Sequence, residues 1–204
     1  MREEHQRRRI LKGAIEVFAQ AGYPATTVDD VVAAARIGVG SFYAQFSGKE
    51  ECLLAAYDQV VEEAQRAVAA AASTGSTWPD QVCRGLQALL DWLAAEPAHG
   101  KVALVEIQTA GPAALARFER DLDEMASLMR QGREHAQPPR LLPDSIELTT
   151  VSGIAWLLNR RLAAADAGSI PSLFQDLGEL VLEPYLGEDA ARAAIAAARP
   201  AGSN

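Results

Sequence analysis

The segment that most constrains the fold of this chain is residues 26–50, TTVDDVVAAARIGVGSFYAQFSGKE. Apolar residues at positions 28, 31, 32 and 35 have i, i+3, i+4, i+7 spacing, which predicts one buried face of a short helix. Thr27 stands just before this helix, where its hydroxyl can accept a backbone N–H that the first turn leaves unpaired. The pattern stops at Arg36-Ile37-Gly38, which predicts a turn.

A second short helix is predicted directly after that turn. It would bring Val39, Phe42 and Phe46 onto one inward face and leave the residues between them on the outer face. Ser47 and Glu50 then have the spacing of a capping box, which predicts the start of a longer helix. Two short helices joined by a tight turn form a helix-turn-helix, whose second helix enters the major groove of DNA.

These residues resemble the TetR family of one-component bacterial transcription regulators. The family pattern is T-T-hydrophobic-acidic-x-hydrophobic, then a turn, then G-T-hydrophobic-Y-x-x-F-x-x-K. The resemblance covers about a quarter of the chain. It implies an all-α homodimer that represses from a palindromic double-stranded DNA operator and is released by a small-molecule effector. The matching positions are Thr26, Thr27, Val28, Asp30, Val31, Gly40, Ser41, Phe42, Tyr43, Phe46 and Lys49.

Three positions depart from the family pattern. Arg36 stands where the family usually has the glycine of the turn, so we expect a locally different turn or a strained residue. Gly38 replaces a common Ser or Thr N-cap, and Val39 replaces a position that is often polar. These departures favour contacts from the end of the second helix, with Lys49 meeting phosphate. The residues predicted to bind DNA are Thr27, Arg36, Val39, Gly40, Ser41, Tyr43, Gln45 and Lys49.

The charge of the chain is unevenly distributed. The net charge of −8 is unusual for a DNA-binding protein, but residues 1–50 carry seven basic and six acidic residues, a balance of +1. The remaining residues carry a balance of −9, which would repel DNA and orient the protein by its basic end. Arg7, Arg8 and Arg9 form the densest basic cluster, which is either a phosphate contact or a solvated helix start.

The sequence contains no pattern for catalysis or metal binding. His5, His99 and His135 are isolated from one another, and no G-x-S-x-G, H-E-x-x-H or P-loop motif occurs. We therefore expect no enzyme, cofactor or metal. Cys52 and Cys83 lie within helical patterns, which favours buried, inactive thiols over a sensing pair. No apolar run has bilayer-spanning length and no signal region follows Met1, so we expect no membrane association and a cytoplasmic location.

Helical periodicity continues along the rest of the chain, and no strand is predicted. We expect a helix-turn-helix domain at residues 1–48 and an effector-binding and dimerisation domain at residues 49–204. Asp144 is the expected cap of the 144–167 helix, and the alanine-rich tail after residue 188 is expected to be a frayed helix. The predicted helices are residues 3–21, 49–72, 77–96, 101–109, 144–167 and 171–185, and a helix after Gly111-Pro112 with a regular apolar face at Leu115, Phe118, Leu122, Met125 and Met129. Gly22 is expected to end the first helix, and residues 73–77 and 136–143 are expected to be breaks between helices.

Two sets of residues in the second domain are candidates for further sites. Glu106 interrupts an apolar helix, so it would face water, meet Arg160 or Arg161, or line a ligand cavity. Individually the pocket candidates are more often core residues; they are Trp92, Glu106, Gln108, Phe118, Met125, Met129, Trp156 and Asn159. The dimer candidates, which would form a four-helix bundle across a two-fold axis, are Ile154, Leu158, Leu177 and Val181.

Two alternatives to a ligand-released repressor remain open. A regulator of the same fold could activate transcription or respond to a protein. A helical ligand-binding or enzymatic protein could instead retain the module without acting on DNA. In the favoured mechanism an effector shifts the 49–72 helix and changes the separation of the two recognition helices from the ~34–36 Å that one turn of the duplex requires. Specific DNA binding by the purified protein would distinguish either kind of DNA-binding regulator from a protein that does not act on DNA.

Overall fold

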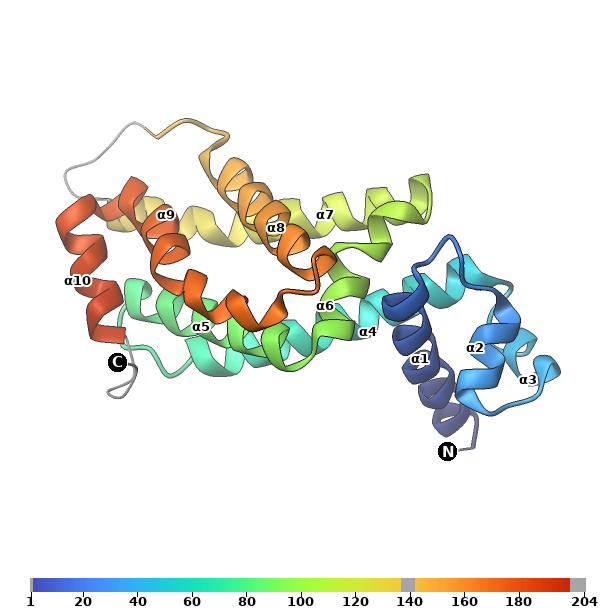
Figure 1. The fold of residues 1–204 in the computed structure, drawn as a ribbon. Coiled ribbons are helices and arrows are strands. Elements are labelled where there is room, and N and C mark those ends of the chain that lie inside the picture. Colours follow the sequence, from blue (N-terminus) through green and yellow to red (C-terminus); the bar gives the residue numbers. More distant parts are fainter. Residues whose placement is uncertain (1, 137–141, 199–204) are drawn as a thin grey trace. The chain divides into compact units, whose positions relative to one another are not determined.

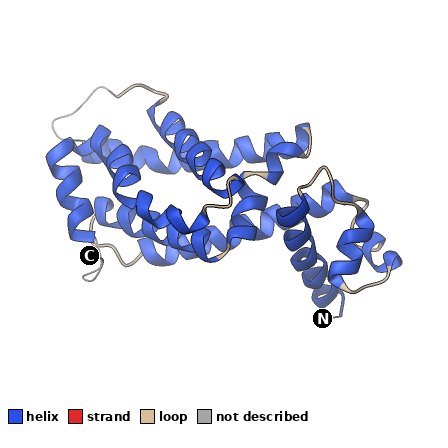
Figure 2. Ribbon diagram, viewed as in Figure 1, coloured by secondary structure: helices blue, strands red, loops and turns tan. Residues whose placement is uncertain are grey.

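The fold is entirely helical in the part of the chain that the structure, a computed structural model, describes, namely residues 2–136 and 142–198 (Figures 1 and 2). This confirms the all-α prediction. None of these helices combines the length and the apolar character that crossing a membrane would require. The helices are α1 (Arg2–Ala21), α2 (Val28–Ala35), α3 (Val39–Tyr43), α4 (Lys49–Ala72), α5 (Trp78–Ala95), α6 (Pro97–Leu104), α7 (Pro112–Met129), α8 (Ile146–Ala163), α9 (Phe174–Leu186) and α10 (Glu188–Ala198), with 3-10 helices η1 (Glu106–Thr109), η2 (Arg130–His135) and η3 (Ala167–Leu173).

The chain forms two compact units. The first extends to Glu63 and takes in Glu96–Glu119, and the second contains Ala64–Ala95 and continues from Arg120. The first unit holds α6 and η1 in addition to α1–α3, because α6 packs against α1. The domains predicted at residues 1–48 and 49–204 were defined by function, whereas these units are defined by packing. The functional division remains a prediction.

The first unit has its core between α1 and α2. Ile10, Ala14 and Phe18 of α1 are fully buried, and Val31 of α2 is buried with them. Gly13 lets the two helices approach closely, since a Cβ at this position would lie 2.9 Å from the backbone nitrogen of Ala35. The apolar face predicted for α2 is therefore confirmed at Val31, Val32 and Ala35. Gly22 ends the α1 region with a φ of 81°, as its position after the last apolar residue predicts.

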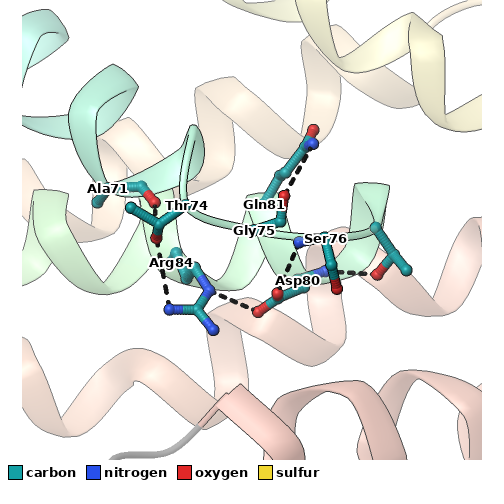
Figure 3. A network of polar contacts seen from close by, with 8 residues as sticks. Ala71, Thr74, Gly75, Ser76, Asp80, Gln81 and Arg84 are labelled. Atoms are coloured by element: carbon teal, nitrogen blue, oxygen red, sulfur yellow. Dashed lines mark hydrogen bonds and ion pairs between the residues drawn. The ribbon is translucent and has the colours of Figure 1, made fainter.

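A polar network fixes the connection between α4 and α5 (Figure 3). The Thr74 hydroxyl donates to a carbonyl of the last turn of α4, and Arg84 donates to both Thr74 and the Asp80 carboxylate. Gly75 is required by the tight turn, because a Cβ there would lie 2.6 Å from the backbone nitrogen of Gln81. The predicted break at residues 73–77 is confirmed, with Thr77 accepting a backbone hydrogen bond at the start of α5.

The second unit is built around α5, which contacts η3, α9 and α10. The alanine-rich tail is a packed helix rather than a frayed one. Ala191 and Ile195 of α10 are buried, and Ile195 lies only 3.1 Å from where a Cβ of Gly178 would stand. Small residues allow α10 and α9 to approach closely, and helical periodicity alone does not report this contact (Figure 1).

Several helix ends differ from the sequence prediction. The 101–109 helix starts earlier, at Pro97, because proline suits the first turn, and it continues as a 3-10 helix after Leu104. Ser145 rather than Asp144 precedes α8, and α8 ends at Ala163, two residues before Ala165 takes a φ of 56°. The loop expected at residues 136–143 lies partly outside the described residues.

Candidate nucleic-acid interface

The first helix of the predicted pair, α2, is capped at both ends. The backbone N–H of Asp30 donates to the Thr27 hydroxyl oxygen at 3.2 Å, and the Thr27 N–H donates to the Asp30 carboxylate at 2.8 Å, which forms a capping box. The hydrogen bond from the Thr27 hydroxyl, with that from its N–H, holds the pKa of Asp30 below its ordinary value. The N-cap predicted at Thr27 is confirmed.

Arg36 ends α2 in the left-handed conformation, with φ 53° and ψ 50°. Its N–H donates to Ala33, and the next N–H, of Ile37, donates to Val32 at 3.2 Å. These bonds satisfy carbonyls that the helix end leaves free, and they reverse the chain toward α3. The strained residue expected at this turn is confirmed.

Arg9 of α1 supports the same turn from outside. Its Nη2 donates to the carbonyl oxygens of Ala35 and Arg36, at 2.8 Å each. A guanidinium at the C-terminal end of a helix is favoured by the helix dipole as well as by the hydrogen bonds. Arg9 therefore fixes the turn, and its charge is used within the fold.

The predicted recognition helix, α3, is anchored by two phenylalanines. Phe42 and Phe46 are buried, with ring centroids 5.6 Å apart. Val39 was predicted to join them, and that prediction is wrong because its side chain is 45% exposed. A five-residue helix has room for only one buried position here, so Val39 lies at the surface, as do Gly40 and the 56% exposed Tyr43.

Lys49 has a different position from the one expected for a phosphate contact. Its Nζ donates to the carbonyl oxygens of Tyr23 and Thr26 at 2.8 Å each, and it lies 4.2 Å from the centre of the Tyr23 ring. Burial, with a smaller effect of Glu50, raises the pKa of Tyr23. Lys49 thus holds the α1–α2 loop against the start of α4, and this corrects the phosphate role that the sequence suggested.

The capping box predicted from Ser47 and Glu50 is not formed at the start of α4, because the Ser47 hydroxyl donates to Glu51 instead of accepting a backbone N–H. Both the N–H and the hydroxyl of Ser47 donate to the Glu51 carboxylate at 2.7 Å, which lowers the pKa of Glu51. The sequence prediction chose Glu50. Because α4 begins at Lys49, Glu51 is the third helical residue and is the one placed to reach back.

The basic cluster at the start of α1 is mostly used inside the fold. The Arg7 guanidinium lies 4.6 Å from the centre of the Phe46 ring, and Arg9 bonds the α2 turn. Arg8 lies 3.8 Å from Glu4, with both side chains largely exposed. The cluster is therefore neither simply solvated nor free as a whole to contact phosphate.

The residues predicted to line a ligand pocket are divided between the two units. Glu106, Gln108 and Phe118 belong to the first unit, and the other five belong to the second. Trp156 is 60% exposed under the Arg160 guanidinium, and Met125 is 38% exposed. Two surface hollows, of about 330 and 280 Å³, involve none of the eight residues. The predicted regular apolar face of α7 also exposes Leu115, because α7 buries Ala114 and Ala126 instead.

Glu106 has a partner that the sequence did not indicate. Its side chain is 7% exposed and accepts a 2.6 Å hydrogen bond from the backbone N–H of Tyr23. The sequence analysis expected this carboxylate to face water, meet Arg160 or Arg161, or line a cavity; a backbone amide of the loop after α1 is its hydrogen-bond donor instead. Gln108 lies at the surface and donates to the Leu104 carbonyl of the preceding turn. Glu106 therefore has a positioning role in the first unit.

Three of the four predicted dimer residues are buried within the single chain. Leu158, Leu177 and Val181 belong to the core of the second unit, which corrects their assignment to a surface. Their helices carry other large apolar side chains at the surface. Leu148 and Trp156 of α8 are 41% and 60% exposed, and Leu180 of α9 is 47% exposed. Apolar periodicity identified both helices but selected their core-facing side.

A buried ion pair in the second unit was missed by the sequence analysis. The Glu147 carboxylate is almost completely buried and accepts from the Arg133 guanidinium at 2.6 and 2.9 Å and from the Tyr185 hydroxyl at 3.3 Å. The Arg133 bond holds the pKa of Glu147 down, whereas burial, with Glu147 nearby, raises the pKa of Tyr185 to about 12. No short motif joins these three positions.

The remaining reactive groups do not form a site in the described part of the chain. Cys52 and Cys83 are free and buried, and burial raises their thiol pKa to about 12 and about 11, so both stay protonated at neutral pH. Residues 2–136 and 142–198 bring no three His, Cys, Asp or Glu side chains together as metal ligands would be. The helix-turn-helix is the feature that defines the molecule.

The capped α2, the reversed turn and the partly exposed α3 define the class: this is a helix-turn-helix protein with a larger helical region. Residues 10–56 match the family model described as bacterial regulatory proteins, tetR family. The match is confined to this part of the chain, and the resemblance to the TetR family read from residues 26–50 is confirmed there. That family is one of transcriptional regulators.

Comparisons with individual proteins show the same resemblance. The chain is 36% identical over 56 residues to the HTH-type transcriptional regulator YerO of Bacillus subtilis. It is 32% identical over 83 residues to the HTH-type transcriptional regulator YhgD of the same organism. These alignments cover 28% and 41% of this chain, and only 19% and 44% of the two relatives. The solved structure of the transcriptional regulator FadR of Bacillus subtilis with stearoyl-CoA has the same fold, with a TM-score of 0.73 at 16% identity, over 86% of this chain and 97% of that one.

Proposed function

We propose that this protein is a sequence-specific, homodimeric DNA-binding regulator that represses transcription from a palindromic operator and is released by a small-molecule effector. The observation that carries the proposal is the construction of the turn and recognition helix. The cap at Thr27, the Arg9 bonds and the buried Phe42 hold α3 in place while Val39 and Tyr43 remain exposed. Preorganised exposed side chains on a short helix are suited to a major groove.

The proposed DNA contacts divide into three roles. Val39, Gly40, Ser41, Tyr43 and Gln45 lie on or directly after α3 and are proposed to meet the edges of bases and the groove wall. Arg36 is proposed to meet the sugar–phosphate backbone. Thr27 and Lys49 act by position, since both side chains are engaged in holding the module together.

Regulation is proposed to reach the DNA-reading module through α6 and η1. Lys101 donates to the Ala19 carbonyl in the last turn of α1 at 3.3 Å, and Glu106 accepts from Tyr23 just beyond it. These bonds attach the segment around α6 to the helix that supports the α2 turn. An effector that displaces this segment would therefore change the position of α3, and tenfold preference for the DNA-free form requires only about 1.4 kcal/mol.

The homodimer is proposed to use the exposed side of α8 and α9. Leu148, Trp156 and Leu180 replace the buried residues first selected, and Ile154, which is half-buried, remains a candidate. A two-fold interface places the same side chains opposite one another, and a palindromic operator matches such symmetry.

The experiment that tests this function measures binding of the purified full chain to fluorescent duplex DNA, with and without a trial effector. Stearoyl-CoA is the first probe because the FadR structure contains it. We expect preference for a selected duplex over a scrambled one, with Gln45→Ala relaxing preference at one or two base pairs. Equal affinity for both duplexes would contradict the function. Tighter DNA binding in the presence of the probe would favour the activator alternative.

A further inference from the structure

Arg36 is held in a backbone conformation that disfavours its own side chain. Its φ of 53° lies in the left-handed region, where a Cβ is crowded against the following peptide and glycine is the usual residue. In residues 2–136 and 142–198, only Arg36 and Ala165 combine a side chain with a positive φ. Strained residues of this kind occur at binding sites, where another gain offsets the cost.

The turn around Arg36 is supported so that this strain is maintained. Arg9 donates to the Ala35 and Arg36 carbonyls, and the Ile37 N–H returns to Val32. All of these bonds involve the backbone of Arg36 or its neighbours. None of them uses the Arg36 guanidinium, and a glycine would keep every one. The need for an arginine at this position therefore does not come from the turn itself.

The Arg36 guanidinium is available to a partner outside the chain. Its side chain is exposed, and within the described residues it takes part in no hydrogen bond, ion pair or ring contact. Three other cations of the module are used internally: Arg7 on a ring, Arg9 on two carbonyls and Lys49 on two more. Arg8 and Lys12 are exposed on α1, whereas Arg36 is the exposed cation at the turn itself. Arg36 directly precedes the segment that begins α3, so it lies where α2 turns into the recognition helix.

We propose that Arg36 is an affinity-determining residue that contacts a DNA phosphate beside the groove that α3 enters, with Arg9 as its positioning residue. The inference rests on the proposed DNA-binding function. It adds that the strained backbone of Arg36 places a positive charge where it can raise affinity for DNA. Arg9 positions the backbone of Arg36 and leaves its guanidinium without a contact among the described residues. Such a long side chain is suited to a phosphate, which is recognised mainly by charge, rather than to a fixed base edge. The strained turn thereby exchanges stability for affinity.

The test uses three substitutions of Arg36 in the full chain, with a duplex selected by the wild-type protein from random DNA and a scrambled duplex as probes. Arg36→Gly removes both the charge and the strain, Arg36→Ala removes the charge alone, and Arg36→Lys keeps both. Arg130→Ala removes one exposed charge from the second unit as the control. Affinity is measured as a function of salt, and melting temperature is measured on the same samples.

We expect Arg36→Gly and Arg36→Ala to weaken both duplexes by the same factor, roughly three- to tenfold. Their dependence of log affinity on log salt should be shallower by about 0.9 per protomer, with Arg36→Lys close to wild type. Arg36→Gly should melt about 2–4 °C above Arg36→Ala and above wild type. Weaker DNA binding together with a higher melting temperature in Arg36→Gly would show that Arg36 lowers the stability of the fold and raises its affinity for DNA.

Two results would overturn the inference while leaving the proposed function intact. The first is specific binding by wild type with unchanged affinity and salt slope in Arg36→Gly and Arg36→Ala. The second is a loss confined to the selected duplex, which would make Arg36 a base contact. Wild-type protein that prefers no duplex would instead contradict the proposed function and the inference together.

Discussion

The Glu106 carboxylate accepts a 2.6 Å hydrogen bond from the backbone N–H of Tyr23, 83 residues earlier in the chain. This single contact joins η1 to the loop that follows α1. A Cβ on Gly22 would lie 3.7 Å from the same Glu106 oxygen, an ordinary contact, so glycine is favoured there by its φ of 81° and not by lack of space. A part-buried loop amide is thus satisfied by a buried carboxylate that the sequence marked only as an interruption of an apolar helix.

Removal of this contact should destabilise the first unit. We expect Glu106→Ala to cost about 1–3 kcal/mol in urea unfolding, because the Tyr23 amide loses its acceptor in a poorly hydrated place. Glu106→Gln should cost less, since its amide oxygen can still accept. Gln108→Ala is the control: it lies on the same 3-10 helix but is exposed. Equal stability of Glu106→Ala and Gln108→Ala would contradict the assigned role.

Arg9 and Arg8 provide a matched pair for the role of the turn support. Arg9→Ala removes two hydrogen bonds to the end of α2, and we expect a loss of about 1 kcal/mol in unfolding free energy. Arg8→Ala should change stability little, because its nearest carboxylate is 3.8 Å away and both groups face water. Urea unfolding of both variants checks this, and a larger effect at Arg8 would rule out the support role of Arg9.

The buried Glu147 predicts a specific dependence of stability on pH. Because its pKa is lower in the folded chain than the ordinary value of 4.5, its charged form contributes stability above that value and loses it as pH falls through the folded-state pKa. The advantage of wild type over Glu147→Gln should therefore be constant above about pH 5.5 and shrink in more acidic solution. Thermal melts from pH 3 to 7 measure it.

The exposed Glu124→Gln variant serves as the control for that series. Its melting temperatures should parallel those of wild type over the whole pH range. If the difference between wild type and Glu147→Gln were also independent of pH, the ion pair with Arg133 would not be responsible for the stability of this region.

Two leucines of α9 distinguish surface from core in the proposed dimer. Leu180→Asp should give a folded, helical monomer in analytical ultracentrifugation, because the 47% exposed side chain is proposed to lie in the interface. Leu177→Asp should lose its helical signal, since burying a carboxylate in the core costs several kcal/mol. A stable dimer from Leu180→Asp would exclude that part of α9 from the interface.

The features that the sequence predicted are those set by neighbouring residues. The cap at Thr27, the end of α1 at Gly22 and the strain at Arg36 each depend on a few adjacent positions. The helical periodicity of α4 gave both of its ends, Lys49 and Ala72, without tertiary information.

The features that the sequence did not predict depend on residues far apart in the chain. Arg9 meets the α2 turn across 26 and 27 positions, and Glu106 meets Tyr23 across 83. Lys49 looked like a free cation because its two acceptors are backbone carbonyls, which no residue type marks. Periodicity also cannot say which of two apolar sides of α8 or α9 faces the core, so three residues predicted for the dimer interface are instead buried within the chain.

Selection of bound sites from a pool of random duplex DNA by the purified full chain tests the central claim most directly. The account predicts an enriched palindrome whose half-sites are about one helical turn apart, ~34–36 Å between centres, with enrichment weakened by Gln45→Ala. A pool that shows no enriched sequence after repeated rounds, from protein that is folded, would contradict the account.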